Sequence, residues 1–505
     1  MADKILFWID RLFVYYGIAK SLQEKYPCEL YGIADIDETA KDFLDSQQTV
    51  KFKKIWFYPD NFQNREKIPD VEYLKKFEKK YDVNLWQIAY GDRHLLKETN
   101  RYYRFSRNEI LLMFEQDCKF FEKILDEINP DFLITTTTSD HHDHLLYEMC
   151  KKRGIRGLMQ RTSRMGYRSI ISEEIDEIDE FENKRHGEYS SDMSLAKVEE
   201  LFDEHSLLTQ YKKIKAKYKI PKSEKLKAFL SFLINGNESN KRYVNFGKTR
   251  TKIFWSGTGI RNFRRKKNIQ NFMEKKFLRK LDDTPFIYFP LHKEPERFLS
   301  IGTPYYANQK EMIKYLAKAI PVGYKLYVRD HPSMLRTTLW ARSIDYYKEV
   351  LDLPNVEIIH SEFDVKEIFK KCSLVVTING TSSLEAAIRN KPSIILTKTD
   401  FSDISSIIKV NKLEDLPKLI REGLKKKVSP AEVSRAMDKL YKNSIKIDSK
   451  EIFSDFHSRF YYTGFLKMPK YSNNELDDYI RKYKETFDRL ADEHIRKISL
   501  MKKNN

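Results

Sequence analysis

The sequence predicts an α/β protein built from two doubly wound domains. Short apolar runs with strand character alternate with helical segments over residues 1–165, and the same alternation restarts over residues 284–425. The chain of 505 residues also exceeds what one hydrophobic core ordinarily organises. We therefore expect an N-terminal domain over 1–165, a helical, basic insertion over 166–283, a second domain over 284–425 and a helical tail over 426–505.

The first domain begins with a continuous apolar run, ILFWI at 5–9, which is typical of a strand buried on both faces of a parallel sheet. A long helix is predicted at 109–128 from apolar residues at helical spacing, and Gly154 ends the helix that precedes the last strand. The remaining strands are expected at 28–33, 54–58, 130–135 and 155–159, with further helices at 75–81 and 144–153.

The second domain repeats this order. Its first two strands are predicted from PFIYFP at 285–290 and YKLYVR at 324–329, and Pro321 ends the helix between them. The later strands are expected at 356–359, 373–378 and 393–396, and the helices at 308–319, 345–351, 365–370 and 382–389. Open parallel sheets bind ligands at the carboxyl ends of their strands, so the loops that follow these strands are the candidate site.

The net charge of +18, from 92 Lys and Arg against 74 Asp and Glu, is concentrated in one segment. Residues 241–280 carry 14 Lys or Arg and one acid, Glu274, so this segment supplies 14 − 1 = +13. Its aromatic residues are Phe246, Phe254, Trp255, Phe263, Phe272 and Phe277. This composition predicts contact with an anionic membrane surface or glycolipid. Base stacking on nucleic acid and ordinary helix packing are the alternatives, and the confinement of the charge to one insertion disfavours nucleic acid.

The four cysteines lie far apart, which indicates reduced thiols rather than a disulfide or zinc pattern. No apolar run reaches the roughly 20 residues of a membrane-spanning helix. Charged residues interrupt the N-terminal apolar stretch, unlike a signal peptide. We expect a cytoplasmic protein with peripheral contact to the inner face of the membrane.

The loop after the strand at 373–378 has the composition of a phosphate site. A glycine permits the turn, and the free N–H groups of the helix that follows favour an anion. A glutamate one turn further on suits a sugar hydroxyl, whereas plain helix capping by the hydroxyl residues is the alternative reading. The candidate donor-binding residues here are Asn379, Gly380, Thr381, Ser382, Ser383 and Glu385.

Two further loops follow strands of the same predicted sheet. Arg329 and His331 lie at the end of one strand, where they suit a phosphate or a sugar hydroxyl, and a surface loop is the alternative. His292 and Glu296 follow another strand and would line the sugar or nucleotide site. Because the carboxyl ends of parallel strands meet at one edge of the sheet, we expect the three loops to converge.

A third kind of pattern, DHHDH at 140–144, follows a strand end in the first domain. The candidate catalytic residues here are Asp140, His142 and Asp143, any of which could serve as a general base. A solvated loop is one alternative. A metal site is the other, but adjacent residues cannot all point at one ion, and no second cluster adds ligands.

Three segments together resemble the capsular-polysaccharide biosynthesis glycosyltransferases. They are FPLHKEPE at 289–296, YKLYVRDHP at 324–332 and NGTSS at 379–383. The His-Pro motif followed by a Ser-Ser motif is also similar to bacterial sialyltransferases, to the Kdo transferases of capsule assembly and to polyol-phosphate transferases. The resemblance implies a two-domain GT-B fold with a cleft between Rossmann-like domains, and a nucleotide-activated donor, commonly a cytidine nucleotide. It implies that His331 contacts the donor phosphate and that Ser382 and Ser383 hold the phosphate or nucleotide.

We therefore expect a metal-independent glycosyltransferase that moves a sugar from a nucleotide sugar, with a CMP-sugar favoured, to a surface polysaccharide or glycolipid. The nucleotide sugar would be a substrate, and no cofactor is expected. A non-hydrolysing UDP-sugar 2-epimerase is the alternative enzyme. A non-catalytic assembly protein that binds an anionic polymer is the alternative from another class.

Overall fold

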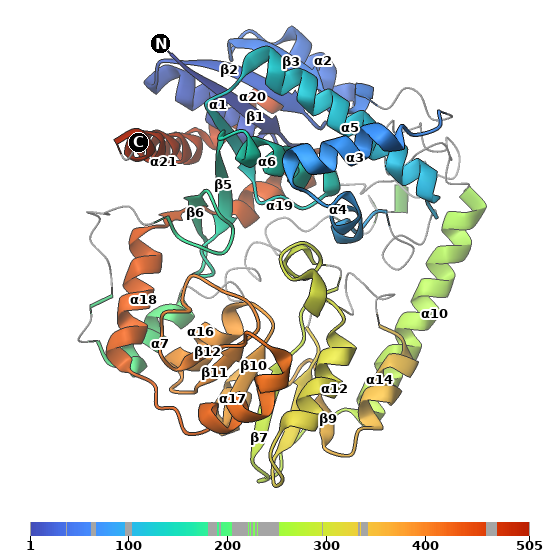
Figure 1. The fold of residues 1–505 in the computed structure, drawn as a ribbon, viewed down its shortest axis with the longest axis vertical. Coiled ribbons are helices and arrows are strands. Elements are labelled where there is room, and N and C mark those ends of the chain that lie inside the picture. The colour runs from blue at the N-terminus through green and yellow to red at the C-terminus, as the bar shows by residue number, and fades with distance from the viewer. Residues whose placement is uncertain are drawn as a thin grey trace. The chain divides into compact units, whose positions relative to one another are not determined.

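The computed structural model describes most of the chain. The described residues are 2–36, 38–61, 67–95, 104–179, 189–190, 193–204, 252–294, 296–331, 342–460 and 472–503, with the isolated positions 221, 223, 226, 227, 230 and 334. The chain forms two compact units, each built on one sheet (Figure 1). Unit 1 comprises Met1–Asn183, His205–Ile253 and Asn443–Asn505, and unit 2 comprises Lys184–Glu204 and Phe254–Lys442.

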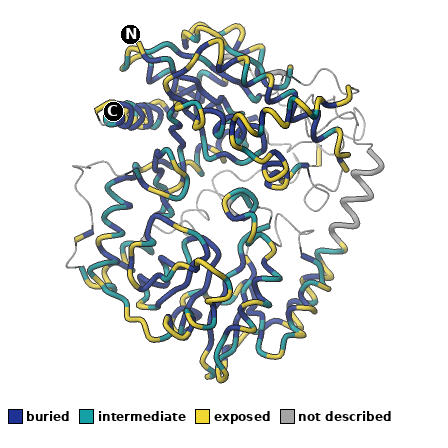
Figure 2. The backbone as a smooth tube through the Cα atoms, in the orientation of Figure 1, coloured by how far each residue is buried: buried dark blue, intermediate teal, exposed yellow. Residues whose placement is uncertain are grey.

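Unit 1 contains a seven-stranded sheet in the order β13-β6-β5-β4-β1-β2-β3. Strands β1 to β5 are parallel, and β6 and β13 add an antiparallel edge. The central strand β1 is buried along nearly its whole length, as its unbroken apolar sequence predicts (Figure 2). The strands are β1 (Asp3–Ile9), β2 (Cys28–Ala34), β3 (Phe52–Phe57), β4 (Phe132–Thr136), β5 (Arg156–Thr162), β6 (Arg168–Ser172) and β13 (Ile445–Lys446).

Helices cover both faces of this sheet, and each face has its own apolar core. One face is covered by α1 (Val14–Lys25), α2 (Glu38–Ser46), α19 (Ser449–Phe460), α20 (Asn473–Lys482) and α21 (Lys484–Lys503). The other is covered by α3 (Val71–Tyr81), α4 (Leu85–Gly91), α5 (Arg107–Ile128) and α6 (His141–Lys152). A capping box of Ser106 and Glu109 starts α5, and Asn129 ends it in a left-handed conformation.

The stretch 426–505, expected as one tail, is divided between the units. Helix α18 (Pro430–Lys442) belongs to unit 2, whereas β13 and the last three helices belong to unit 1. Helix α21 packs along α1, and its buried Lys497 lies 2.7 Å from Asp179. No local pattern in the sequence predicts that α21 packs along α1, because these contacts join residues hundreds of positions apart.

Unit 2 contains a six-stranded sheet in the order β12-β11-β10-β7-β8-β9, with every pair parallel. Numbered along the unit, this is the 3-2-1-4-5-6 order of a Rossmann-like domain, and unit 1 shows the 3-2-1-4-5 part of it. The predicted pair of doubly wound domains is thus confirmed. The strands are β7 (Phe286–Pro290), β8 (Lys325–Arg329), β9 (Val356–Ile359), β10 (Leu374–Thr377), β11 (Ser393–Ile395) and β12 (Ile407–Lys409).

The helices of unit 2 include two from the predicted insertion. They are α7 (Leu195–Glu204) and α10 (Lys252–Lys276), followed by α11 (Arg297–Ser300), α12 (Gln309–Ala319), α14 (Ile344–Leu351), α15 (Val365–Lys371), α16 (Thr381–Ile388) and α17 (Leu416–Gly423). Helix α7 packs against α16 and α18. Across the described part of the chain, no helix combines the length and apolarity needed to cross a membrane.

The basic segment 241–280 lies partly outside the described residues, which resume at 252, with side chains described from 264 onward. Phe272 and Phe277 pack into the apolar core of unit 2. These two rings are therefore helix-packing residues and are not free for stacking, which corrects the expectation for them. The basic side chains do face outward: Arg264, Lys267, Lys275, Lys276, Arg279 and Lys280 are exposed.

Candidate functional site

The switch point of unit 2 lies between β7 and β10, where the strand order reverses. His292, from the loop after β7, contacts the end of β10 across this point. Its Nε2 accepts a hydrogen bond from the Asn379 backbone N–H at 3.4 Å and lies 3.3 Å from Thr377 Oγ1. A nitrogen that accepts from an N–H carries no proton, so in the neutral ring the proton is on Nδ1, which lies 3.9 Å from Glu296 Oε2.

The start of α16 is open toward the same edge. Gly380 has φ 127° and ψ 179°, a conformation that favours glycine, and no described side chain caps the first turn of the helix. Ser383 is buried, and its hydroxyl donates to the Gly380 carbonyl at 3.2 Å, so this hydroxyl shapes the turn. Thr381 and Ser382 are partly exposed. The free N–H groups of such a helix start favour an anion.

Glu385 follows one turn later on α16 and lies 3.9 Å from Arg389. Burial raises the pKa of the Glu385 carboxyl, although Arg389 opposes the rise. The carboxyl can therefore be protonated more readily than a solvated one, and in that state it offers a donor as well as an acceptor.

The two predicted residues of the loop after β8 differ in their surroundings. Arg329 donates to the carbonyl oxygens of Ser361 at 2.7 Å and Phe363 at 3.1 Å, so it holds the loop after β9. His331 is exposed, and Pro332 lies outside the described residues. Of the predicted pair, His331 is the one that presents its side chain to solvent.

Asp330 and Arg342, which were not among the predicted site residues, connect this loop to the loop after β7. Both side chains are almost fully buried and form an ion pair, and the Tyr347 hydroxyl also donates to Asp330. Arg342 donates to the His292 carbonyl at 2.8 Å and lies 3.2 Å from Glu294 Oε1. The three loops therefore converge: a buried ion pair joins the loops after β7 and β8, and His292 contacts the loop after β10.

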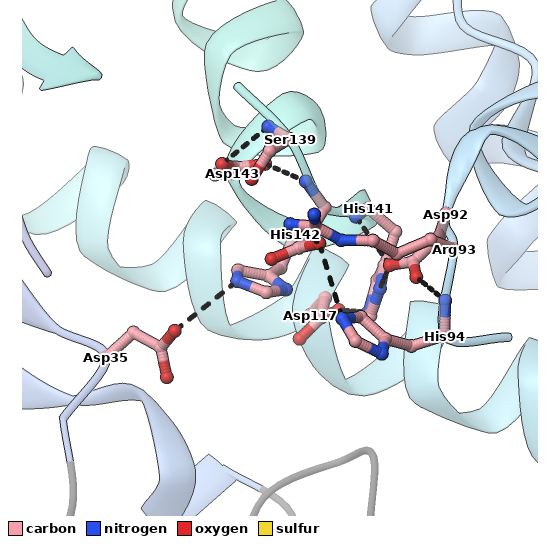
Figure 3. A network of polar contacts seen from close by, with 10 residues as sticks. Asp35, Asp92, Arg93, His94, Asp117, Ser139, His141, His142 and Asp143 are labelled. Atoms are coloured by element: carbon pink, nitrogen blue, oxygen red, sulfur yellow. Dashed lines mark hydrogen bonds and ion pairs between the residues drawn. The ribbon is translucent and has the colours of Figure 1, made fainter. Parts of the chain in front are cut away.

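Unit 1 gathers acids and histidines near the carboxyl ends of β2 and β4 (Figure 3). His142, at the start of α6, points toward Asp35 with its Nε2 3.8 Å from Oδ2. Its ring stacks on Tyr58 at 4.5 Å and lies 5.2 Å from Trp8. Burial alone would lower the pKa of His142, but Asp35 outweighs burial and raises it. His142 is thus a buried, charge-paired ring.

His141 lies between two carboxylates. Its Nδ1 is 2.7 Å from Asp92 Oδ2, and its Nε2 is 3.0 Å from Asp117 Oδ2, with all three side chains fully buried. Burial opposes charge on the ring, but the two carboxylates raise the pKa of His141 to about 10. The ring is therefore protonated at neutral pH, and it joins α4, α5 and α6 beneath the sheet edge.

The other predicted residues of this loop have separate partners. Asp143 accepts the backbone N–H groups of Ser139 at 2.9 Å and Asp140 at 2.9 Å, which caps α6, and burial raises its pKa to about 6. Asp140 is paired with Arg93 at 3.3 Å. Within the described ranges, no three His, Cys, Asp or Glu side chains are placed to hold one metal ion.

Asp10 and Asp35, at the ends of β1 and β2, were missed although a signal existed: each acid follows an apolar strand directly. Burial raises the pKa of Asp10 to about 7, and the charge of Asp35 adds to the rise while the Leu12 N–H opposes it. For Asp35, burial is outweighed by His142 and Arg11, and its pKa is lowered.

A comparison with known proteins finds similarity to one protein family. A family model described as capsule polysaccharide biosynthesis protein matches residues 199–443. No curated protein matches the chain. Among solved structures, the UDP-GlcNAc 2-epimerase of Methanocaldococcus jannaschii is 14% identical, with 86% of this chain and 98% of that chain covered and a TM-score of 0.24. A glycosyltransferase of Rickettsia africae is 11% identical, with 92% and 99% covered and a TM-score of 0.27.

The KpsC beta Kdo 2,7 transferase of Thermosulfurimonas dismutans is 12% identical, with 74% and 96% covered and a TM-score of 0.29. The resemblance predicted from the three motif segments agrees with the family model, because all three segments lie within the matched residues. Residues 199–443 of the chain thus match the model of the capsule polysaccharide biosynthesis protein family.

Proposed function

We propose that the protein is a glycosyltransferase of surface-polysaccharide assembly. It would move a sugar from a nucleotide-activated donor, with a CMP-sugar favoured, to a polysaccharide or glycolipid acceptor. The observation that carries this proposal is the open start of α16 beside His292 at the switch point of unit 2. The match of residues 199–443 to the model of the capsule polysaccharide biosynthesis protein family supports the setting in capsule assembly.

The donor would be bound by unit 2. Its phosphate would lie on the backbone N–H groups at the start of α16, where Gly380 allows close approach and the hydroxyls of Thr381 and Ser382 add donors. The exposed His331 would contact the same phosphate. Asn379, by contrast, is buried beside His292 and would position the turn.

The sugar or nucleoside would be held by Glu296, next to His292, and by Glu385 on α16. Arg329 would act indirectly, because its guanidinium is bound to two backbone carbonyls. As the bond between the anomeric carbon and the phosphate oxygen breaks, negative charge grows on the leaving phosphate. The helix start and His331 would stabilise that charge, so the proposed transfer requires no metal.

The test uses the full chain with CMP-, UDP-, GDP- and CDP-linked donors, and measures binding, hydrolysis and transfer to capsule oligosaccharides. We expect one nucleotide class to bind and to be consumed. Ser382→Ala should weaken binding of that donor about tenfold to a hundredfold, since it removes one hydrogen bond to a charged group. Ser373→Ala, just before the opposite end of β10, is the matched control and should leave binding unchanged.

Two other outcomes would contradict the proposed function. If no donor class binds to the wild-type protein, the proposed function is wrong. Interconversion of a free nucleotide sugar without any acceptor would indicate the epimerase instead. Contact with an anionic membrane through 241–280 remains part of the proposal, and the outward-facing basic side chains of α10 support it.

A further inference from the structure

The turn between β1 and α1 occupies the switch point of unit 1, where β2 and β4 flank β1. In this turn, buried Phe13 has φ 55°, a left-handed conformation that is costly for an aromatic residue. The Phe13 N–H donates to the Asp10 carbonyl at 3.2 Å. The surrounding core therefore holds a strained turn at the place where doubly wound sheets bind ligands, with Asp10 as its first residue.

The Asp10 carboxylate is enclosed but incompletely bound. Among the residues that the structure describes, its Oδ1 is buried and has no hydrogen-bond partner. An unpaired buried carboxylate oxygen is costly, so such an atom in a native protein calls for an explanation. A substrate hydroxyl that donates to Oδ1 would supply the missing partner.

The titratable side chains that interact with Asp10 come from three other parts of the unit. They are Asp35 after β2, Tyr15 on α1 and Tyr479 on α20, while Arg11 and His142 act on Asp35. Asp35 is held ionised by His142 and Arg11, and its negative charge makes ionisation of Asp10 harder. The two neighbouring carboxyls thus differ in protonation: Asp35 stays charged, whereas Asp10 exchanges a proton near neutral pH.

The other acids and histidines at this edge are already engaged. Asp143 is used to cap α6, His141 lies between two carboxylates, and His142 is enclosed by aromatic rings. Asp140 is paired with Arg93. Asp10 is partly exposed, and one of its carboxylate oxygens has no hydrogen-bond partner among the described residues. None of the other four residues has both features.

We propose that Asp10 is the general base that takes the proton from the acceptor hydroxyl. This inference rests on the proposed function. The acceptor O–H bond breaks, its proton passes to Asp10 Oδ1, and the oxygen forms a bond to the anomeric carbon of the donor. The bond from that carbon to the donor phosphate breaks, and the phosphate leaves with the electron pair. This single displacement inverts the anomeric configuration.

The experiment compares wild type with Asp10→Asn, Asp10→Glu and the control Asp3→Asn. Asp3 lies at the opposite end of β1, where it is bound to Lys502 and Tyr26. We expect Asp10→Asn to lower the transfer kcat by 10²- to 10⁴-fold with little change in donor Kd, and Asp10→Glu to recover part of the loss. Asp3→Asn should retain wild-type kcat. In wild type, kcat should rise with pH through about 7, because the base acts only when deprotonated.

The measurements distinguish a folding defect from a failure of the proposed function and from a failure of the assignment of Asp10. Donor Kd and circular dichroism show whether each variant is folded. If wild type transfers sugar while a folded Asp10→Asn stays within threefold of it, or if the product retains the donor's anomeric configuration, the assignment of Asp10 is overturned and the proposed function stands. If wild type transfers nothing from any donor class, the proposed function fails first.

Discussion

Replacement of His141 by glutamine tests the buried ion pairs beneath the edge of the first sheet. The substitution removes the only positive charge between Asp92 and Asp117 in the described surroundings, and all three side chains are fully buried. The pKa of His141 rises from 6.5 to about 10 in the folded protein, which corresponds to about 5 kcal/mol of stabilisation of the charged ring. Breaking a buried pair by removal of one partner costs roughly 3–5 kcal/mol, which agrees in magnitude.

The pH dependence follows from the sign of this shift. The folded pKa lies above the unfolded value, so the stabilisation is complete below about pH 6.5 and is lost as pH rises through about 10. Urea unfolding, followed separately for each unit's transition, should show His141→Gln less stable than wild type by about 3–5 kcal/mol at pH 6. The difference between the two should shrink toward pH 10.

His94→Gln is the matched control. Burial lowers the pKa of His94, so this residue does not titrate between pH 7 and 10, and its replacement should leave the slope in that window unchanged. A cost below about 1 kcal/mol for His141→Gln at pH 6, or a difference from wild type that is constant with pH, would refute the charged assignment of His141.

Two further changes test the switch point of unit 2. Gly380→Ala forces a Cβ into φ 127° and should weaken nucleotide binding about tenfold by calorimetry, whereas Gly154→Ala, at φ 74° in unit 1, should cost stability only. Equal nucleotide affinity in Gly380→Ala would contradict a phosphate site at α16. Arg342→Met leaves Asp330 buried without its cation and should cost about 3–5 kcal/mol in unfolding, while Arg342→Lys keeps the charge and should recover part of it. A neutral Arg342→Met would show that this pair does not hold the loops together.

The sequence predicts the strands of both sheets well, since runs such as ILFWI and PFIYFP are apolar throughout and short. It missed β6, β12 and β13, which are edge or near-edge strands of two to five residues with weak patterns. Their pairing depends on neighbours that are distant in sequence, such as Ile445 beside Ser169.

The donor-side loops could be predicted because they follow strands that lie next to one another in the sheet. The roles within each loop could not be. His141 and His142 are adjacent in sequence, yet only contacts with Asp92, Asp117 and Asp35 determine which ring is paired with which acid. Ser382 and Ser383 differ in the same way, because the turn of α16 buries one hydroxyl and leaves the other partly exposed.

The division of unit 1 along the chain has a consequence for biosynthesis. Helices α19 to α21 complete the apolar face formed by α1 and α2, and β13 completes the edge of the sheet. A ribosome makes the first strands early and these closing helices only after the whole of Phe254–Lys442 has been made. Unit 2 can therefore finish folding while the aromatic face around Phe13 and Tyr16 is still uncovered. During that interval, the nascent chain exposes a large apolar surface of the kind that chaperones bind.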